Sequence, residues 1–180
     1  MINEFRITPK YFLFWGSIFS QWYKISFKDF NGTKFSSAEQ FMFYHKALLF
    51  NDLDSVKLIM LTNIPREQKE LGRKVKNFNE DIWIEYREKI VFLASFYKFN
   101  QNLNLKKELL FFMDKTFVEA SPKDIIWGIG LHYNDEKAED QKQWKGMNLL
   151  GRQLNLVALD IKNNSLKLMR TYEKDLYNLT

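Results

Sequence analysis

The 180-residue sequence has no cysteine. Disulfides, thiolate catalysis, iron–sulfur clusters and cysteine-ligated zinc sites are therefore excluded. Histidine is also scarce, because His45 and His132 are the only two and they lie far apart in the chain. A histidine-based metal site or a Ser-His-Asp triad could exist only in a minimal form. We expect neither a metal nor a cofactor.

Long apolar runs are missing as well. No run in the sequence approaches the ~20 residues that a membrane-spanning helix needs. The first residues lack the pattern of a targeting segment. No internal repeat and no linker rich in proline, glycine or serine divides the chain. We therefore expect a single cytoplasmic domain without a membrane partner.

The familiar catalytic signatures are absent too. The sequence has no P-loop, no G-x-G-x-x-G, no G-x-S-x-G and no H-E-x-x-H. It also lacks zinc-finger and RNA-recognition signatures. Generic motifs thus assign no activity, and the information lies in composition, periodicity and shorter clusters.

Aromatic residues and positive charge are what the chain has in abundance. Aromatics make up 17% of the residues, including 17 phenylalanines, and the net charge is +5 with a pI near 9.2. The aromatics predict a core of bulky side chains, and they can also build a stacking pocket for a flat ligand. The basic surface attracts phosphates, nucleotides or nucleic acid without identifying a partner.

Hydrophobic periodicity predicts a mainly α fold. The segment around Asn31-Gly32 differs, because alternating apolar and polar residues flank a hairpin-type turn. We expect a small antiparallel β element there, near the N-terminus. The predicted helices cover residues 36/37–50, 52–61, 65–76, 80–97, 103–112 and 148–161, with a further amphipathic helix in the tail 163–180.

Six short polar-aromatic clusters follow one another along the chain. They are Phe14-Trp15-Gly16 with Phe19-Ser20-Gln21-Trp22; Ser37 to Met42 with Lys46-Ala47; Leu71-Gly72-Arg73; Lys98-Phe99; Phe117 to Pro122 with Asp124 to Gly130; and Asn148 to Gly151. In this order they resemble the NADAR superfamily, also called the YbiA-like family. The resemblance extends over about residues 12–156.

The resemblance implies a compact, mainly helical, YbiA-like single domain over residues 1–160, with 161–180 as a helical C-terminal extension. It also implies an N-glycosidase, which is a hydrolase. YbiA-type members cleave the C–N bond between ribose 5-phosphate and pyrimidine intermediates of riboflavin synthesis. Other members remove ADP-ribose from modified guanine, reversing a toxin's action. The expected partner is a small phosphoribosyl or ADP-ribosyl substrate, or a nucleic acid that carries ADP-ribosylated guanine. A non-catalytic ADP-ribose or NAD-binding module is the alternative from another class.

Glu39 has two interpretations. It follows Ser36 by three positions at a helix start, which is the spacing of a capping box. The resemblance instead makes it a catalytic carboxylate that stabilises an oxocarbenium-like state or protonates the leaving nitrogen. The positive end of the helix should lower the pKa of Glu39, which suits a base or an electrostatic stabiliser better than an acid.

Lys46 follows Glu39 by seven residues, so both project from one helix face with backbones about 10 Å apart. Its long side chain should lean back toward Glu39, leaving room for a small ligand between them. By resemblance Lys46 is a site residue. One role is a contact to phosphate or ribose, and the other is an amine that forms a Schiff base, which requires a lowered pKa.

Glu119 and Asp124 form a second acidic cluster. The run Ser121-Pro122 is typical of a helix start, so Asp124 can be explained as a cap. Glu119 lies among apolar residues, which should raise its pKa toward that of a general acid. We expect it to be the partner of Glu39 in the two-carboxylate arrangement of glycoside cleavage.

The other predicted site residues are contacts to substrate. Trp15 and Trp127 can stack on the base or fill the core, while Gly16 and Gly128 are glycines of the matched clusters, Gly128 allowing close backbone approach. Arg73 and Lys98 are the phosphate candidates. Ser20 matches the family's N-terminal serine, and Asn148 can bind a sugar hydroxyl or cap the last helix. The charged loop between Leu131 and Gly146 is expected to vary with substrate choice.

Overall fold

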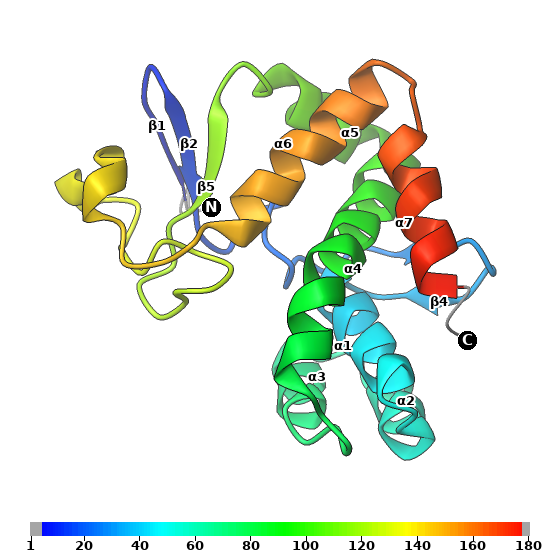
Figure 1. Ribbon diagram of the computed structural model, residues 1–180. Coiled ribbons are helices and arrows are strands. Elements are labelled where there is room, and N and C mark those ends of the chain that lie inside the picture. Colours follow the sequence, from blue (N-terminus) through cyan, green and yellow to red (C-terminus); the bar gives the residue numbers. More distant parts are fainter. Residues whose placement is uncertain (1–4, 178–180) are drawn as a thin grey trace.

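The computed structural model describes residues 5–177, and most of them are helical, as predicted (Figure 1). The helices are α1 (Ala38–Leu49), α2 (Leu53–Leu61), α3 (Pro65–Gly72), α4 (Glu80–Gln101), α5 (Leu103–Phe111), α6 (Leu149–Lys162) and α7 (Lys167–Tyr177), with 3-10 turns η1 (Glu136–Glu139) and η2 (Gln141–Gln143). The strands are β1 (Phe5–Ile7), β2 (Tyr11–Phe14), β3 (Phe27–Lys28), β4 (Lys34–Phe35) and β5 (Thr116–Glu119).

Helix α4 is the centre of the helical part, with α1, α6 and α7 packed around it. Residues 90–99 of α4 are all buried, which explains why this helix has no single apolar stripe. It extends to Gln101, beyond the end predicted near 97. By contrast, the helix predicted over 65–76 ends at Gly72. Within the described residues, no helix has the length and apolarity needed to cross a membrane.

The predicted antiparallel element is present as the β3–β4 pair, with Phe27 opposite Phe35. Its turn is longer than a two-residue hairpin, and it is closed by Asp29, whose Oδ1 accepts the Thr33 N–H at 2.8 Å. Gly32 has a φ of +82°, a conformation that glycine adopts readily. The residues of the predicted Asn-Gly turn therefore do turn the chain, inside a wider loop.

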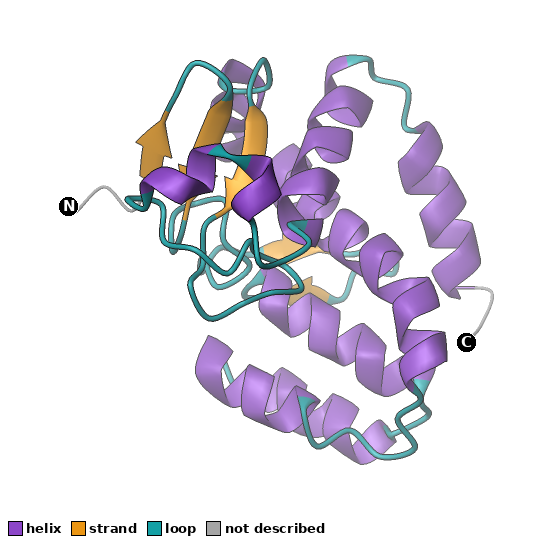
Figure 2. Ribbon diagram, turned by 60° about the vertical axis from the view of Figure 1, so that its left-hand side comes forward, coloured by secondary structure: helices purple, strands orange, loops and turns teal. Residues whose placement is uncertain are grey.

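A second, three-stranded sheet was not predicted (Figure 2). Its central strand β2 pairs antiparallel with β1 and parallel with β5, so that Phe14 lies opposite Glu119. All four residues of β2 are buried, which removes the alternation by which a strand is recognised in sequence. Its partner β5 lies more than 100 residues further along the chain, beyond the reach of local patterns.

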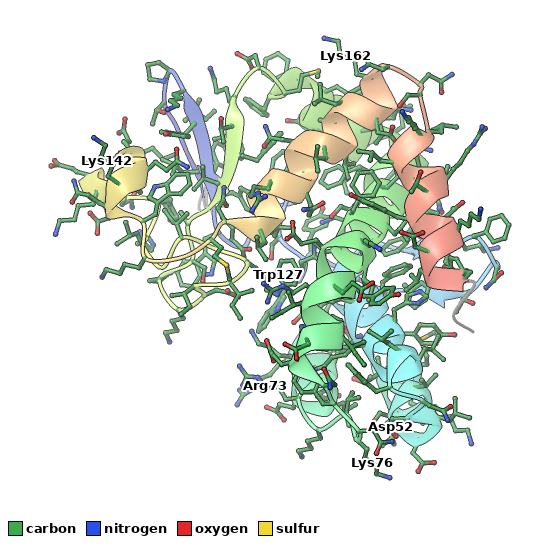
Figure 3. The ribbon with its side chains drawn as sticks, viewed as in Figure 1. Asp52, Arg73, Lys76, Trp127, Lys142 and Lys162 are labelled. Atoms are coloured by element: carbon green, nitrogen blue, oxygen red, sulfur yellow. The ribbon has the colours of Figure 1, made fainter. Side chains whose placement is uncertain are left out.

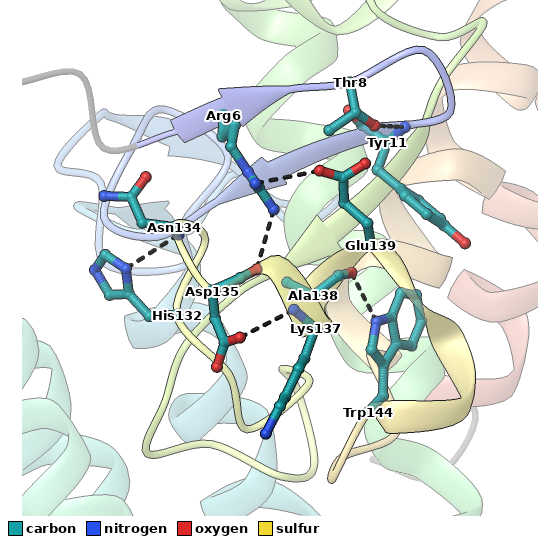
Figure 4. Close-up of polar contacts among 10 residues, drawn as sticks. All are labelled: Arg6, Thr8, Tyr11, His132, Asn134, Asp135, Lys137, Ala138, Glu139 and Trp144. Atoms are coloured by element: carbon teal, nitrogen blue, oxygen red, sulfur yellow. Dashed lines mark hydrogen bonds and ion pairs between the residues drawn. The ribbon is translucent and has the colours of Figure 1, made fainter.

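The segment 132–144 packs against the outer part of this sheet (Figure 4). Arg6 of β1 forms an ion pair with Glu139 at 3.2 Å and donates to the Asp135 carbonyl oxygen at 3.1 Å. The indole N–H of Trp144 donates to the Ala138 carbonyl oxygen at 2.9 Å. These contacts attach the charged loop to the N-terminal strands.

Residues 120–147 connect β5 to α6 and are held largely by backbone hydrogen bonds. The N–H of Ile129 donates to the carbonyl oxygen of Glu119 at 2.9 Å, and that of Met147 donates to Ile125 at 2.9 Å. The Lys145 N–H donates to the Ile129 carbonyl oxygen at 2.9 Å. The connection therefore folds back on itself through its main chain.

Helix α7 lies against α4. Tyr97 donates a hydrogen bond from its hydroxyl to Glu173, and Lys89 forms an ion pair with Asp175 at 2.9 Å. The predicted tail helix over 163–180 is thus present over Lys167–Tyr177. Residues 178–180 lie outside the part of the chain that the structure describes.

Candidate active site

A central cavity of about 320 Å³ lies where α1, α3, the start of α4 and the loop after β5 meet. In Figure 3, Arg73 after α3 and Trp127 of the loop lie on the same side of α4. The titratable lining residues are Glu39, Lys46, Lys69, Arg73, Glu119, Lys123 and Asp124. Aromatic lining residues are Trp22, Phe43, Trp83 and Trp127. The site thus combines carboxylates, cations and flat rings.

Glu39 is the second residue of α1, and its side chain faces this cavity. The N-cap is Ser37, whose side chain accepts the backbone N–H of Gln40 at 3.0 Å. Gln40 in turn accepts the N–H of Ser36 at 2.8 Å. The capping-box interpretation of Glu39 is therefore wrong, because Gln40 occupies the position that reaches back.

The pKa of Glu39 is raised from 4.5 to about 7, because burial penalises its charged form. Only 4% of the surface of Glu39 is exposed. Lys69, a hydrogen bond from the Trp22 side chain, and Arg73 oppose this rise without cancelling it. The predicted lowering of this pKa by the helix N-terminus is wrong, because desolvation outweighs the helix end.

Glu119 ends β5 and faces the same cavity. Its Oε2 is buried and has no hydrogen-bond partner among the described residues. Burial, together with the negative charges of Asp124 and Glu39, raises its pKa from 4.5 to about 8. The direction is the one predicted from its apolar neighbours. Two carboxylates with raised pKa values therefore share one cavity.

Asp124 organises the loop after β5 rather than a helix. Its Oδ1 accepts the backbone N–H groups of Ile126 at 2.9 Å and Trp127 at 2.8 Å. The helix predicted to begin at Ser121 does not form, so the explanation of Asp124 as a helix cap is wrong. The turn that Asp124 closes brings the Trp127 ring to the cavity.

Lys46 lines the cavity from α1, but its ammonium points toward α3. The Nζ donates to the carbonyl oxygen of Gly72 at 3.0 Å and lies 4.2 Å from the ring centre of Phe78. Burial lowers the pKa of Lys46, and Glu80 opposes this shift. Lys46 and Glu39 share the cavity as predicted, while the expected lean toward Glu39 is replaced by the contact with Gly72.

Two cations near the end of α3 line the cavity, and only one of them was predicted from the sequence. Lys69 and Arg73 are four residues apart, and neither forms an ion pair with any residue in 5–177. The Nζ of Lys69 lies 5.5 Å from the ring centre of Trp22. Arg73 was a predicted phosphate contact, and the i, i+4 spacing could have pointed to Lys69. Trp22, Trp83 and Lys123 were likewise missed.

Lys98, a predicted phosphate contact, is not among the residues that line the central cavity. It is fully buried on α4, where its Nζ donates to the Ser20 carbonyl oxygen at 2.8 Å. Burial lowers its pKa to about 7. The Ser20 hydroxyl accepts the N–H of Trp22 at 3.1 Å. Ser20 and Lys98 thus hold the segment that carries Trp22 into the cavity.

Asn148 and Gly128 lie against the main chain of Glu119, outside the lining of the cavity. Asn148 accepts the Glu119 N–H at 2.9 Å and donates to the Phe117 carbonyl oxygen at 3.0 Å. It stands at the N-cap of α6 but makes no side-chain capping bond. A Cβ at Gly128 would lie 2.7 Å from the Glu119 carbonyl oxygen, so only glycine fits without a shift. Neither residue lines the cavity.

Trp15 and Gly16 lie at the surface outside the cavity. The Trp15 ring meets the edge of His132, with ring centres 5.5 Å apart. Gly16 has a φ of +79°. Of the twelve predicted site residues, those brought to the cavity are Glu39, Lys46, Arg73, Glu119, Asp124 and Trp127.

Comparison with known proteins shows the family to which this chain belongs. The model of the NADAR domain family matches residues 13–162. The chain belongs to the NADAR family. N-glycosidase R617 of Acanthamoeba polyphaga mimivirus is 45% identical over 159 residues, covering 82% of this chain and 94% of that protein. This similarity supports a hydrolase of the N-glycosidase class.

One further sequence relative and one solved structure are also similar to the NADAR chain. Protein irg-1 of Caenorhabditis elegans is 38% identical over 130 residues, which are 71% of this chain and 61% of the worm protein. The solution structure of E. coli YbiA superimposes with a TM-score of 0.72, at 20% identity and with 92% of each chain covered. The fold is therefore YbiA-like.

Proposed function

We propose that this NADAR protein hydrolyses the C–N bond between a phosphorylated ribose and a nitrogen heterocycle or its amine, as in intermediates of riboflavin biosynthesis. The observation that carries this proposal is the pair of buried carboxylates, Glu39 and Glu119, in a cavity that is also lined by Lys69 and Arg73, which form no ion pair within residues 5–177. A volume of about 320 Å³ is at the lower end for small-molecule sites, which favours a compact substrate.

The two carboxylates suit the two halves of the reaction. With a pKa of about 8, Glu119 carries its proton at neutral pH and can give it to the leaving nitrogen as the C–N bond breaks. Glu39, with a pKa of about 7, is partly ionised there and can stabilise the oxocarbenium-like carbon or activate water. Water then adds to the sugar carbon, yielding free ribose phosphate and the amine.

The remaining groups fit the two ends of such a substrate. Lys69 and Arg73 present cations to a phosphate, and an arginine can bind two phosphate oxygens at once. Trp22 and Trp127 offer ring faces for a heterocycle. The carboxylates lie in the same cavity as both groups.

Lys46 fits two roles that predict different outcomes. As an electrostatic contact it would bind ribose or phosphate without covalent chemistry. As a nucleophile it would attack C1 of the ring-opened substrate and expel the amine, forming an imine that water then hydrolyses to free ribose phosphate and Lys46. Its lowered pKa favours that attack. Borohydride added during turnover would reduce an imine and leave the sugar attached to Lys46, which peptide mass spectrometry detects. If Lys46 stays unmodified, the electrostatic role is favoured.

The second candidate is an ADP-ribosyl hydrolase that acts on guanine in nucleic acid. The observation in its favour is the mouth of the cavity, where Trp22 is 44% exposed and Ile125 is 59% exposed, next to the cations Lys69 and Lys123. Such a surface suits a larger, polyanionic substrate. A non-catalytic ADP-ribose or NAD-binding module would use the same groups without turnover.

Product detection separates these possibilities. The wild type and the variants Glu39→Gln and Glu119→Gln would be incubated with a ribosylaminopyrimidine phosphate, and separately with ADP-ribosylated guanosine and DNA. Free ribose 5-phosphate, lost in both variants, is the expected result. Free ADP-ribose would favour the second candidate. The exposed Glu108→Gln variant on α5 is the matched control and should keep full activity. Binding without product from any substrate would contradict both enzymatic proposals.

A further inference from the structure

A second cavity of about 350 Å³ lies along α1, α4 and α7 and shares no lining residue with the central cavity. Helix α1 contributes residues 45, 48 and 49 to it, but residues 39, 42, 43 and 46 to the central cavity. Helix α4 likewise contributes residues 82, 85 and 86 to the second cavity and Trp83 to the central one. Different faces of the same two helices therefore form two separate cavities.

The lining of the second cavity is mainly apolar. Leu48 and Leu49 of α1, Ile82 of α4 and Leu176 of α7 form its walls, with Tyr86 beside them. Among these, Ile82 is exposed while Leu176 is buried, so the cavity has an outer and an inner end. Its volume lies in the range of sites for small organic ligands.

Two polar groups in this lining lack partners. His45 is only 2% exposed, and its Nε2 has no hydrogen-bond partner among the described residues. Burial lowers the pKa of His45 to about 3, so the imidazole is neutral at physiological pH. A buried polar atom without a partner costs free energy, and a ligand could supply the missing hydrogen bond.

The second polar group is Glu85, which is exposed and forms no ion pair within residues 5–177. Lys89, four residues further along α4, interacts electrostatically with Glu85, but its ammonium forms its ion pair with Asp175 at 2.9 Å. On the facing α7, Asp175 is paired with Lys89, and Glu173 accepts the hydrogen bond of the Tyr97 hydroxyl. Glu85 is therefore the carboxylate that a cationic group would meet at the outer end of the cavity.

We propose that the second cavity is a ligand site for a small aromatic amine with a hydroxyl at its far end. The ring lies between the leucines and Ile82, and the ammonium faces Glu85. The hydroxyl pairs with His45. Because a hydroxyl both donates and accepts, it suits either tautomer of the neutral imidazole. The proposal is independent of the reaction at the central cavity.

Nuclear magnetic resonance provides a direct test, because the sequence has only two histidines. Tyramine, 4-(2-aminoethyl)phenol, would be titrated into ¹⁵N-labelled protein while the imidazole and indole signals are followed. We expect saturable shifts of the His45 signals, while those of His132 stay fixed. None of the five tryptophans lines the second cavity, whereas Trp22, Trp83 and Trp127 line the central one. Shifts of these indole signals instead would place the amine in the central cavity and overturn the proposal.

Matched probes test the chemistry of the ligand. The neutral 4-ethylphenol should bind about fivefold more weakly than tyramine. A difference of about fivefold in affinity is the most that an exposed ion pair usually contributes. The anion 3-(4-hydroxyphenyl)propionate should not bind. Equal affinities for all three probes, or no shift of the His45 signals with any of them, would refute the site.

Two variants complete the test. Glu85→Gln is a surface change that should reduce tyramine affinity to that of 4-ethylphenol and leave catalytic turnover unchanged. Leu48→Trp should fill the cavity and abolish binding of both, with an otherwise native amide spectrum as evidence of folding. Unchanged tyramine affinity in Glu85→Gln would contradict the ion pair, even if Leu48→Trp fails to fold.

Discussion

Replacing Glu39 by glutamine is expected to make the protein more stable at alkaline pH while abolishing its activity. In the folded chain the pKa of Glu39 is about 7, against the ordinary value of 4.5 for a glutamate. A carboxyl with a raised pKa holds its proton more tightly when folded. Its stabilising effect is therefore fully present below about pH 4.5 and is lost as the pH rises through about 7.

The size of the effect follows from this difference in pKa. One pKa unit corresponds to about 1.4 kcal/mol, so the ionised Glu39 costs the fold about 3 kcal/mol above pH 7. This value already includes the attraction of Lys69 and Arg73. Glutamine resembles the protonated carboxyl and never ionises. In a domain of this size, about 3 kcal/mol corresponds to about 6–12 °C in Tm.

Thermal and urea unfolding of wild type and Glu39→Gln at about pH 4.5 and about pH 9 would measure this. The two proteins should be equally stable at the lower pH, and the variant should gain its advantage only at the higher pH. Glu108→Gln on the exposed side of α5 should show no such divergence. A variant that is less stable at about pH 9, or whose advantage does not change with pH, would refute the reasoning.

Three further outcomes are expected. The rate should peak between about pH 7 and about pH 8, falling below this window as Glu39 gains a proton and above it as Glu119 loses one. A rate that does not fall on going from about pH 7 to about pH 5, or from about pH 8 to about pH 10, would contradict the assignment. Arg73→Ala should raise KM for a phosphorylated substrate about tenfold with little change in kcat. Arg66→Ala, in the first turn of α3, removes an ion pair with Glu70 and should change neither. Gly151→Ala would place a Cβ 2.1 Å from a β5 carbonyl oxygen and should lower the free energy of unfolding by about 1–3 kcal/mol, which urea unfolding at neutral pH measures.

The helices could be predicted from the sequence because apolar residues recur at helical spacing in them, and because capping side chains mark the starts of α1, α2 and α4. The unpredicted sheet depends on pairing between β2 and β5, which are more than 100 residues apart. Local patterns carry no information about such a pairing, and strands of three or four residues are too short for an alternation to stand out. For the same reason, the sequence could not show that Glu119 lies at the end of a strand that places it at the cavity.

Burial explains most errors at the site. Helix α4 is apolar on several faces, so the sequence could not show that Lys98 points inward to Ser20. At the start of α1 the error was a shift of one residue, since Ser37 and not Ser36 is the N-cap. One residue corresponds to about 100° around a helix, which is the difference between capping the helix end and facing the cavity. The pKa of Glu39 was misjudged for a related reason, because the sequence shows the helix end but not the burial.

The connection between β5 and α6 has a consequence for how this enzyme can diversify. Its shape depends on main-chain hydrogen bonds and on the Asp124 carboxylate, whereas Lys123, Ile125 and Ile126 line the cavity. Substrate preference can therefore drift by point mutation without loss of the loop's form. The loop could be exchanged between relatives as a unit, provided that Gly128 and Asn148, which hold it against the main chain of Glu119, are kept.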